Sequence, residues 1–387
     1  MSEIFETRVI LRPEDIPPSS ENLRVLGVIN PGAARVDGRT RLLVRVIEAH
    51  KANDPYDEHM IRGADAPEYV YLPRAHNHGL HWEKKRLGKE VEANDRYSVK
   101  STGLVEVVRP TVISHARSVE ITREKPSGPP RVESVEQKGL FPKRAYEEFG
   151  IEDPRITALT SPLATLEGEY KYLISYVACS GTWGIASAFA LSNDLTTFRR
   201  FPPGNPRALF HPPQKDVVVF PEKLAGRLSG REQWFALIRP GAAYNYISPS
   251  IFLLSSPDLV HWGQPWPCVA GTTEGHVGGG VPPLKTDRGW LIIYHGRRRA
   301  NGGEPCYEGW GALVDYQEPW TSIHRSREPI LTPFETGGAD VIPNVAFPTG
   351  AVILDDGTLE VYLGLNDTVT AVARADLDGL LDRLLRR

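Results

Sequence analysis

Short apolar runs, bounded by glycine, proline or acidic residues, recur along almost the whole chain. Runs of this length between turn residues are typical of β-strands, whereas helices show apolar residues at every third or fourth position over longer stretches. Only residues 374–387 have this helical spacing, with Asp376 near the start of the expected helix. The pattern therefore predicts an all-β chain that ends in a short C-terminal helix.

Five strand-like segments share one design, in which a turn with glycine or an acid precedes an apolar run. They are residues 37–46, 167–177, 230–240, 287–296 and 356–365. Their apolar runs are nearly continuous, as expected for strands that are covered on both faces. Equivalent positions recur roughly every 60 residues, except that the first interval is about twice as long. Residues 51–100, which are polar and rich in turn residues, explain this interval as an insertion.

A repeat of this length fits one blade of a β-propeller, since a blade of four strands takes roughly 40–50 residues. We therefore predict one domain over residues 1–387, a five-bladed β-propeller; six blades, one of them degenerate, are the alternative. The innermost strand of each blade lines a central channel. If the five segments are those strands, the polar residues at their ends, among them Arg45, Arg239 and His295, face one another. Alternatively, these ends simply meet water.

Composition and charge restrict the class of function. The 387 residues include 41% hydrophobic residues and carry a net charge of −3, which allows a large core but gives no basic bias for nucleic acid. No apolar run reaches the roughly 18–20 residues that span a membrane, and the N-terminus does not resemble a signal peptide. The cysteines, Cys179, Cys268 and Cys306, lack the spacing of a metal or disulfide site. We expect a cytoplasmic protein that binds no metal, nucleic acid or membrane.

Residues 149–159 read FGIEDPRITAL, so that two acids precede a proline and an arginine. Pro154 fixes its own φ angle and favours an extended conformation for Asp153, which would hold the carboxylate with little loss of entropy. Arg155 is placed to pair with a neighbouring acid or to clamp a substrate oxygen. The same residues also fit a simple turn that enters a strand, and spacing alone leaves both interpretations open.

Two further segments concentrate polar side chains beside apolar runs. In residues 211–223, Lys215 is suited to an anion and Glu222 to a hydroxyl group of a ligand. Glu274 and His276 precede three consecutive glycines, in an expected loop that can approach a ligand closely. A buried strand with charged ends is the alternative. Carboxylates, amides, arginine, histidine and tryptophan together suit a neutral ligand rich in hydroxyl groups.

In their order, the motifs resemble those of glycoside hydrolase family 130, the β-mannoside phosphorylases and related β-mannosidases. The resemblance covers about residues 30–373 and rests on the series NPGA, LLVRV, SHARS, FGIEDPRIT, KDVVVFPEK, LIRP, HVGGGVPPLKTDRGWLIIYHG, PNVAFPTG and YLGLNDT. Each motif alone is weak, but the ordered series is specific. It implies a five-bladed propeller that acts on short β-mannosides with inorganic phosphate as co-substrate and no other cofactor. Because members are often oligomeric, it also implies a homo-oligomer.

The resemblance implies roles for individual residues. Asp153 corresponds to the proton donor, which acts through the 3-hydroxyl of the mannosyl unit while phosphate attacks the anomeric carbon from the opposite face. The positions that bind the mannosyl unit correspond to Asn30, Arg45 and Asp367. The positions that bind phosphate correspond to Lys215, Arg239, His295 and Tyr307, with His276 near the phosphate or the acceptor sugar. Lys215 replaces an arginine of some members, which keeps the charge but loses the bidentate fork.

Three functions are compatible with the sequence. The four phosphate-site residues favour an inverting phosphorylase, because an anionic nucleophile needs cations and donors but no protein base. An inverting β-mannosidase specific for β-1,2 linkages would need a carboxylate base to activate water, for which Glu222 and Glu274 are the candidates. A sugar-binding propeller without turnover is the third.

Overall fold

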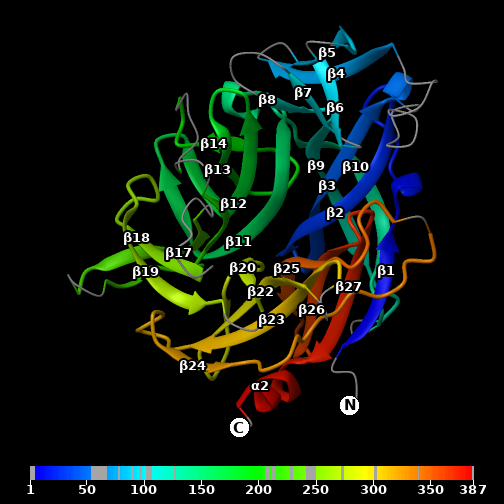
Figure 1. The fold of residues 1–387 in the computed structure, drawn as a ribbon. Helices are drawn as coiled ribbons and strands as arrows, with labels where there is room; N and C mark the ends of the chain where they lie inside the picture. Colours follow the sequence, from blue (N-terminus) through cyan, green and yellow to red (C-terminus); the bar gives the residue numbers. More distant parts are fainter. Residues whose placement is uncertain are drawn as a thin grey trace.

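The computed structural model describes residues 5–53, 68–76, 79–88, 91–95, 98–101, 107–125, 128–204, 210, 214–226, 230–240, 250–271, 274–299, 303–338 and 340–385. Within these residues the chain is mostly β-strand, and the one α-helix lies at the C-terminal end. This confirms the predicted all-β class with a short C-terminal helix. Four large sheets lie around the middle of the molecule, and two small sheets lie at one side (Figure 1).

The largest sheet has eight strands and consists of two halves. The first half contains β2 (Leu23–Val36), β3 (Arg39–His50), β9 (Val112–Thr122) and β10 (Arg131–Leu140). The second half contains β11 (Gly150–Thr165), β12 (Gly168–Ser180), β13 (Gly184–Ser192) and β14 (Arg199–Phe201). Pairing within each half is antiparallel, and one parallel bridge, between Ser114 and Gly150, joins the halves.

The other three large sheets are antiparallel. One contains β15 (Lys215–Val219), β16 (Leu224–Ala225), β17 (Glu232–Arg239), β18 (Ser250–Ser256) and β19 (Gly263–Ala270). The next contains β20 (His276–Gly279), β21 (Leu284–Lys285), β22 (Trp290–Arg299), β23 (Pro305–Val314) and β24 (Ser322–Arg325). The last contains β25 (Ala346–Ile353), β26 (Thr358–Leu365), β27 (Val369–Asp376) and β1 (Glu6–Leu11).

The two ends of the described chain meet in this last sheet. The N-terminal strand β1 pairs with β27, the final strand, so residues from the start complete a sheet built by the end. Helix α2 (Leu377–Leu385) follows directly, and the Asp376 carboxylate accepts a hydrogen bond from the backbone N–H of Gly379 at 2.8 Å. This bond satisfies one of the free donors of the first turn.

Part of the predicted insertion, residues 51–100, lies outside the described residues. The described part and the residues after it form two small sheets, from β4 (Tyr69–His76), β5 (Gly79–Arg86), β6 (Val91–Asp95), β7 (Ser98–Ser101) and β8 (Val107–Pro110). The β4–β5 hairpin is attached to Glu148, whose backbone oxygen accepts a hydrogen bond from Ala75 at 2.7 Å and whose carboxylate pairs with Arg74 at 2.8 Å. The hairpin is thus anchored five residues before Asp153.

The strands that line the centre of the molecule are not the five segments that the sequence pattern predicted as innermost. The selected segments form β3, β12, β17, β22 and β26, and each pairs with the strand that lies nearest the centre, β2, β11, β15, β20 or β25. The strands β2, β11, β15, β20 and β25, with the residues that follow them, surround the centre. The assignment was wrong by one strand, because the most continuous apolar runs belong to strands buried inside a sheet. No sheet among the described residues closes on itself, and the count of five blades stays a prediction.

Candidate active site

Three of the inner strands interrupt their pairing at an asparagine or aspartate. Asn30 in β2, Asp153 in β11 and Asp216 in β15 have positive φ angles of 48°, 48° and 58°. Each lies at a shift of register against the next strand of its sheet. Asn and Asp tolerate this left-handed region better than most residues, and such bulges often redirect a side chain beside an active site.

The conformation of Asp153 therefore differs from the sequence prediction. Pro154 should favour an extended residue before it, but Asp153 has a φ of +48°. Pairing between β11 and β12 stops at Glu152 and resumes at Arg155, so the bulge determines this conformation. A non-glycine residue held in the left-handed region stores strain, and such strain is concentrated at functional sites.

The Asp153 carboxylate is buried and held through one oxygen. Its Oδ1 accepts hydrogen bonds from Asn30 Nδ2 at 2.7 Å and Arg45 Nη1 at 2.9 Å. Burial by itself would raise the pKa of Asp153, but the charges of Arg45, Arg155 and Lys215 outweigh it and lower the pKa. The carboxylate is ionised in the free protein, and the contacts to Oδ1 leave Oδ2 for a ligand.

Asp367 lies in the same group of charges, but its pKa is raised, whereas the pKa of Asp153 is lowered. Burial raises the pKa of Asp367 to about 6, with a further contribution from Asp153 and against the opposing charge of Arg45. Two nearby carboxylates with separated pKa values are a common feature of sites that transfer protons.

Asp367→Asn is expected to stabilise the protein at neutral and alkaline pH but not in acid. An unfolded aspartate titrates near 3.8 and the native Asp367 near 6, so between these values only the native state binds the proton. Stability is therefore lost as the pH rises through this window, by up to about 3 kcal/mol. Thermal unfolding should show a higher Tm than the wild type at pH 8 and no gain at pH 4. The matched control is Asp355→Asn, at an exposed side chain; an equal gain at both pH values would contradict the raised pKa.

A second cluster surrounds Asp216, which is completely buried. Its carboxylate lies 2.6 Å from Arg239 Nε, 3.1 Å from Arg155 Nη2 and 3.5 Å from His295 Nε2. Burial lowers the pKa of His295 to about 3 despite the opposing charge of Asp216, so the imidazole is neutral at pH 7. Arg155 contacts both Asp216 and the backbone oxygen of Asp153, so the two aspartates belong to one continuous site.

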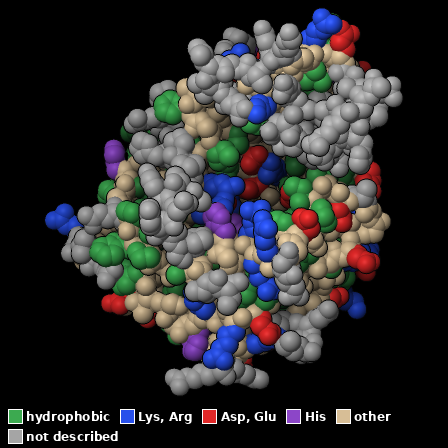
Figure 2. All heavy atoms as spheres, viewed as in Figure 1, with side chains coloured by type: hydrophobic (Ala, Val, Ile, Leu, Met, Phe, Trp, Pro, Cys, Tyr) green, Lys and Arg blue, Asp and Glu red, His purple; other side chains and the backbone are tan. Residues whose placement is uncertain are grey.

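Aromatic and imidazole rings line this second cluster. His276 Nε2 lies 3.1 Å from Arg239 Nη1. The ring centroid of His295 lies 6.0 Å from that of Tyr307 and 4.2 Å from that of Phe347. Figure 2 shows basic, acidic and histidine side chains gathered in a hollow at the middle of one face.

Most of the residues singled out in the sequence thus lie together. Those in contact or in electrostatic reach of one another are Asn30, Arg45, Asp153, Lys215, Arg239, His276, His295, Tyr307 and Asp367. They come from sequence positions more than 300 residues apart. The inner and second strands of the sheets, the third strand β23 with Tyr307, and the turn between β26 and β27 with Asp367 bring them to one place.

Arg155 is buried directly behind the site. Its guanidinium donates to the backbone oxygens of Gly280 at 3.0 Å, Gly279 at 3.1 Å and Asp153 at 3.2 Å, besides its contact with Asp216. Because the protein already uses these donors, the geometry does not favour Arg155 as the predicted substrate clamp.

The two candidate carboxylate bases are engaged elsewhere. Glu222 binds Lys285 Nζ at 2.6 Å and Thr160 Oγ1 at 3.2 Å. Thr160 follows Asp153 by seven residues in the same strand, or roughly 20 Å at the rise of a β-strand. Glu274 is buried, pairs with Arg325 of the outer strand β24, and accepts a hydrogen bond from the Tyr294 hydroxyl at 2.9 Å. In these contacts, residues other than those around Asp153 hold the carboxylates of both glutamates.

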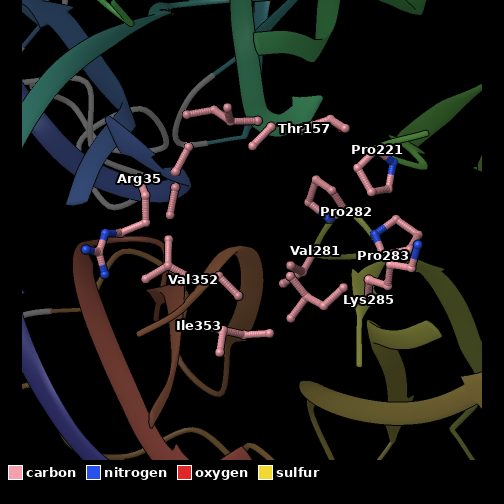
Figure 3. Close-up of a pocket in the computed structure, with 15 residues that line it drawn as sticks. Arg35, Thr157, Pro221, Val281, Pro282, Pro283, Lys285, Val352 and Ile353 are labelled. Carbon is pink, nitrogen blue, oxygen red and sulfur yellow. The ribbon is translucent and has the colours of Figure 1, made fainter. Parts of the chain in front are cut away.

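A cavity of about 210 Å³ lies at the other end of the inner strands (Figure 3). Its lining is mostly apolar and includes Ile156, Val281, Pro282 and Val352. The charged group of residues and this apolar cavity therefore occupy opposite parts of the molecular centre.

The three glycines before Val281 do not form the expected loop: Gly278 and Gly279 belong to β20 and Gly280 follows it.

Sequence reasoning missed Asp216 and Phe347 as members of the site. The sequence KDVVV places Asp216 as EDPRI places Asp153, one residue after a charged residue and near the start of an inner strand. Comparing the starts of the inner strands would have found it.

The described residues contain no cluster of His, Cys, Asp and Glu suited to a metal ion. In that same part of the chain, no helix has the length and apolarity needed to cross a membrane.

With this geometry in place, comparison with known proteins identifies the family. A family model described as beta-1,4-mannooligosaccharide phosphorylase matches residues 105–386. The chain belongs to glycoside hydrolase family 130. The match includes Asp153, Asp216, Arg239, His295 and Asp367, and so covers the central carboxylates of both clusters but not Asn30 and Arg45.

Relatives in this family extend the comparison to the N-terminal strands. A β-1,2-mannobiose phosphorylase of Listeria innocua is 30% identical over 98% of this chain and 97% of its own. A 1,2-β-oligomannan phosphorylase of a Thermoanaerobacter species is 31% identical over 58% of this chain and 67% of its own. The solved structure of the Listeria innocua β-1,2-mannobiose phosphorylase with β-1,2-mannobiose has a TM-score of 0.75 at 27% identity and covers 97% of this chain and 96% of that chain.

Proposed function

We propose that this protein is an inverting phosphorylase of short β-mannosides, with β-1,2-mannobiose as its first expected substrate. The observation that carries the proposal is the wall of donors beside Asp216 and Asp153, formed by the cations Lys215 and Arg239 with the imidazoles of His276 and His295. Such a wall suits a phosphate anion, which needs charged donors and no protein base. The full-length relative that bears the name of a β-1,2-mannobiose phosphorylase supports the choice of substrate.

In the proposed reaction, a phosphate oxygen attacks the anomeric carbon as the glycosidic bond breaks. The product is α-mannose 1-phosphate, and the leaving sugar oxygen receives a proton from Asp153 through the 3-hydroxyl of the mannosyl unit. Asn30 and Arg45, which hold Asp153, also reach that unit, as does Asp367. Asp153 is ionised in the free protein, and the negative charge of bound phosphate offsets its cationic neighbours and favours its protonated form.

Hydrolysis is the second candidate, and the positions of Glu222 and Glu274 argue against it. An inverting hydrolase needs a carboxylate base on the opposite side of the sugar from the acid, with room for one water between them. Glu222 is bound by Lys285, near the far end of the inner strands, and Glu274 by Arg325. A binding protein without turnover would leave the strained Asp153 without a use.

For the fold, we propose five blades in one domain. The two halves of the eight-stranded sheet and the three other large sheets make five units, and each contributes one inner strand to the centre. The single bridge between Ser114 and Gly150 is weak support for treating the halves as one blade.

The function is tested by supplying mannosides with and without phosphate. Purified protein is incubated with β-1,2-mannobiose, β-1,4-mannobiose or β-mannosyl-glucose, and products are identified by ³¹P and ¹H NMR. We expect α-mannose 1-phosphate and free acceptor sugar only when phosphate is present. Free mannose at equal rates in both samples would establish hydrolysis, and no turnover of any mannoside would favour a binding protein.

A further inference from the structure

We propose that Asp216 is a positioning residue that fixes the phosphate-binding side chains and links them to the backbone of Asp153. This inference rests on the proposed phosphorolysis. It gives a role to a carboxylate that neither touches the sugar nor takes part in proton transfer.

The burial of Asp216 requires an explanation. Removing a carboxylate from water is costly unless ion pairs and hydrogen bonds compensate for it. Asp216 is 0% exposed and lies against Arg155 of β11, Arg239 of β17 and His295 of β22. Burial would raise the pKa of Asp216, but Arg239, His295, Arg155 and Lys215 together hold it well below its usual value. The group is therefore a permanent anion at the junction of three sheets.

This anion determines which atoms of its partners remain for phosphate. Arg239 Nε lies 2.6 Å from Asp216 Oδ2 as an ion pair without hydrogen-bond geometry, and this pair fixes the guanidinium whose terminal nitrogens can bind phosphate. One of these nitrogens, Nη1, also lies beside His276 Nε2. For His295, Nε2 lies beside Asp216 and Nδ1 is buried without a hydrogen-bond partner among the described residues. The imidazole is therefore fixed between Asp216 and the ring of Phe347, whose centroid lies 4.2 Å away.

The same carboxylate connects the two halves of the site. Arg155 joins Asp216 Oδ1 at 3.1 Å to the backbone oxygen of Asp153 at 3.2 Å. The arrangement also depends on Gly278, where an added Cβ would lie 2.5 Å from Asp216 Oδ2 and 2.6 Å from the His295 ring. Gly278 thus creates the space in which the anion and the imidazole meet.

The test replaces Asp216 by the isosteric asparagine. We expect Asp216→Asn to lower kcat/KM for phosphate by roughly tenfold to hundredfold, as for the loss of a hydrogen bond to a charged group, and to change KM for β-1,2-mannobiose by less than about threefold. Calorimetry with inorganic phosphate alone should show the same loss of affinity without any turnover. If charge alone mattered, removing the anion would strengthen phosphate binding, so tighter or unchanged binding would overturn the proposal.

Gly278→Ala provides a second variant in case the first folds poorly. Its methyl group should displace Asp216 and His295 and weaken phosphate binding in the same selective way. The matched control is Gly263→Ala, where an added Cβ meets nothing within 4 Å. Equal losses for phosphate and mannobiose would reduce Asp216 to a purely structural role. A wild type that binds phosphate but does not phosphorolyse mannosides would contradict the proposed function, while the calorimetric comparison would still decide the role of Asp216.

Discussion

Asp153→Asn is expected to lower kcat for the phosphorolysis of β-1,2-mannobiose by about 10²–10⁴-fold, the usual contribution of a positioned general acid. Asparagine keeps the size of the side chain and an oxygen that can accept from Asn30 and Arg45, but it has no proton to transfer. The loss should therefore fall on kcat, with KM for mannobiose and the Tm changed little. Initial rates at saturating phosphate measure it.

An activated substrate separates proton donation from other roles of Asp153. A dinitrophenyl β-mannoside carries a leaving group that departs without protonation, so the asparagine variant should recover most of its rate with this compound. The matched control is Asp355→Asn, whose side chain is 96% exposed. An equal loss with both substrates, or wild-type activity with mannobiose, would refute Asp153 as the proton donor.

Arg239→Lys is expected to raise KM for phosphate by roughly tenfold to hundredfold. Lysine keeps the positive charge but cannot bind Asp216 through one edge and phosphate through a fork at the same time. Alanine is the poorer choice, because it removes one partner from a buried anion and destabilises the fold by about 3–5 kcal/mol. Rates are measured with phosphate varied at saturating mannobiose, and then with mannobiose varied at saturating phosphate.

The selectivity of this effect decides the role of Arg239. KM for mannobiose should stay within about threefold of the wild type, since Arg239 lies with Asp216 and His276 and not with Asn30. Arg199→Lys, at a side chain that is 68% exposed, is the control for a general effect of the substitution. Equal changes in both KM values would remove Arg239 from the phosphate site.

The fold could be predicted from the sequence as far as its class and its recurring strand. Strands such as β12 and β22 are buried between neighbours, so their apolar runs are continuous and easy to recognise. The inner strands are harder to find, because they combine apolar residues with polar ones and contain bulges. β20, for example, is His276–Gly279, and its glycines suggest a loop. Which strand lies innermost depends on pairing between segments and not on the composition of either.

The site could be predicted in part for a similar reason. Asp153, Arg239 and His295 follow from the ordered motifs, whereas the positive φ angles at Asp153 and Asp216 follow from gaps in strand pairing that no local pattern reveals. Glu274 is the converse example. It lies two residues before His276, but its carboxylate pairs with Arg325, 51 residues later, a distant partner that no local pattern reveals.

The pairing of β1 with β27 has a consequence for synthesis. Glu6 faces Arg374 across this pair, so during synthesis β1 stays without this partner until a segment more than 350 residues later has been made. Until then β1 has an unpaired edge, which is the kind of surface that promotes association between nascent chains. A chain cut short before β27 would keep this edge of β1 unpaired, which would expose it to quality-control proteases.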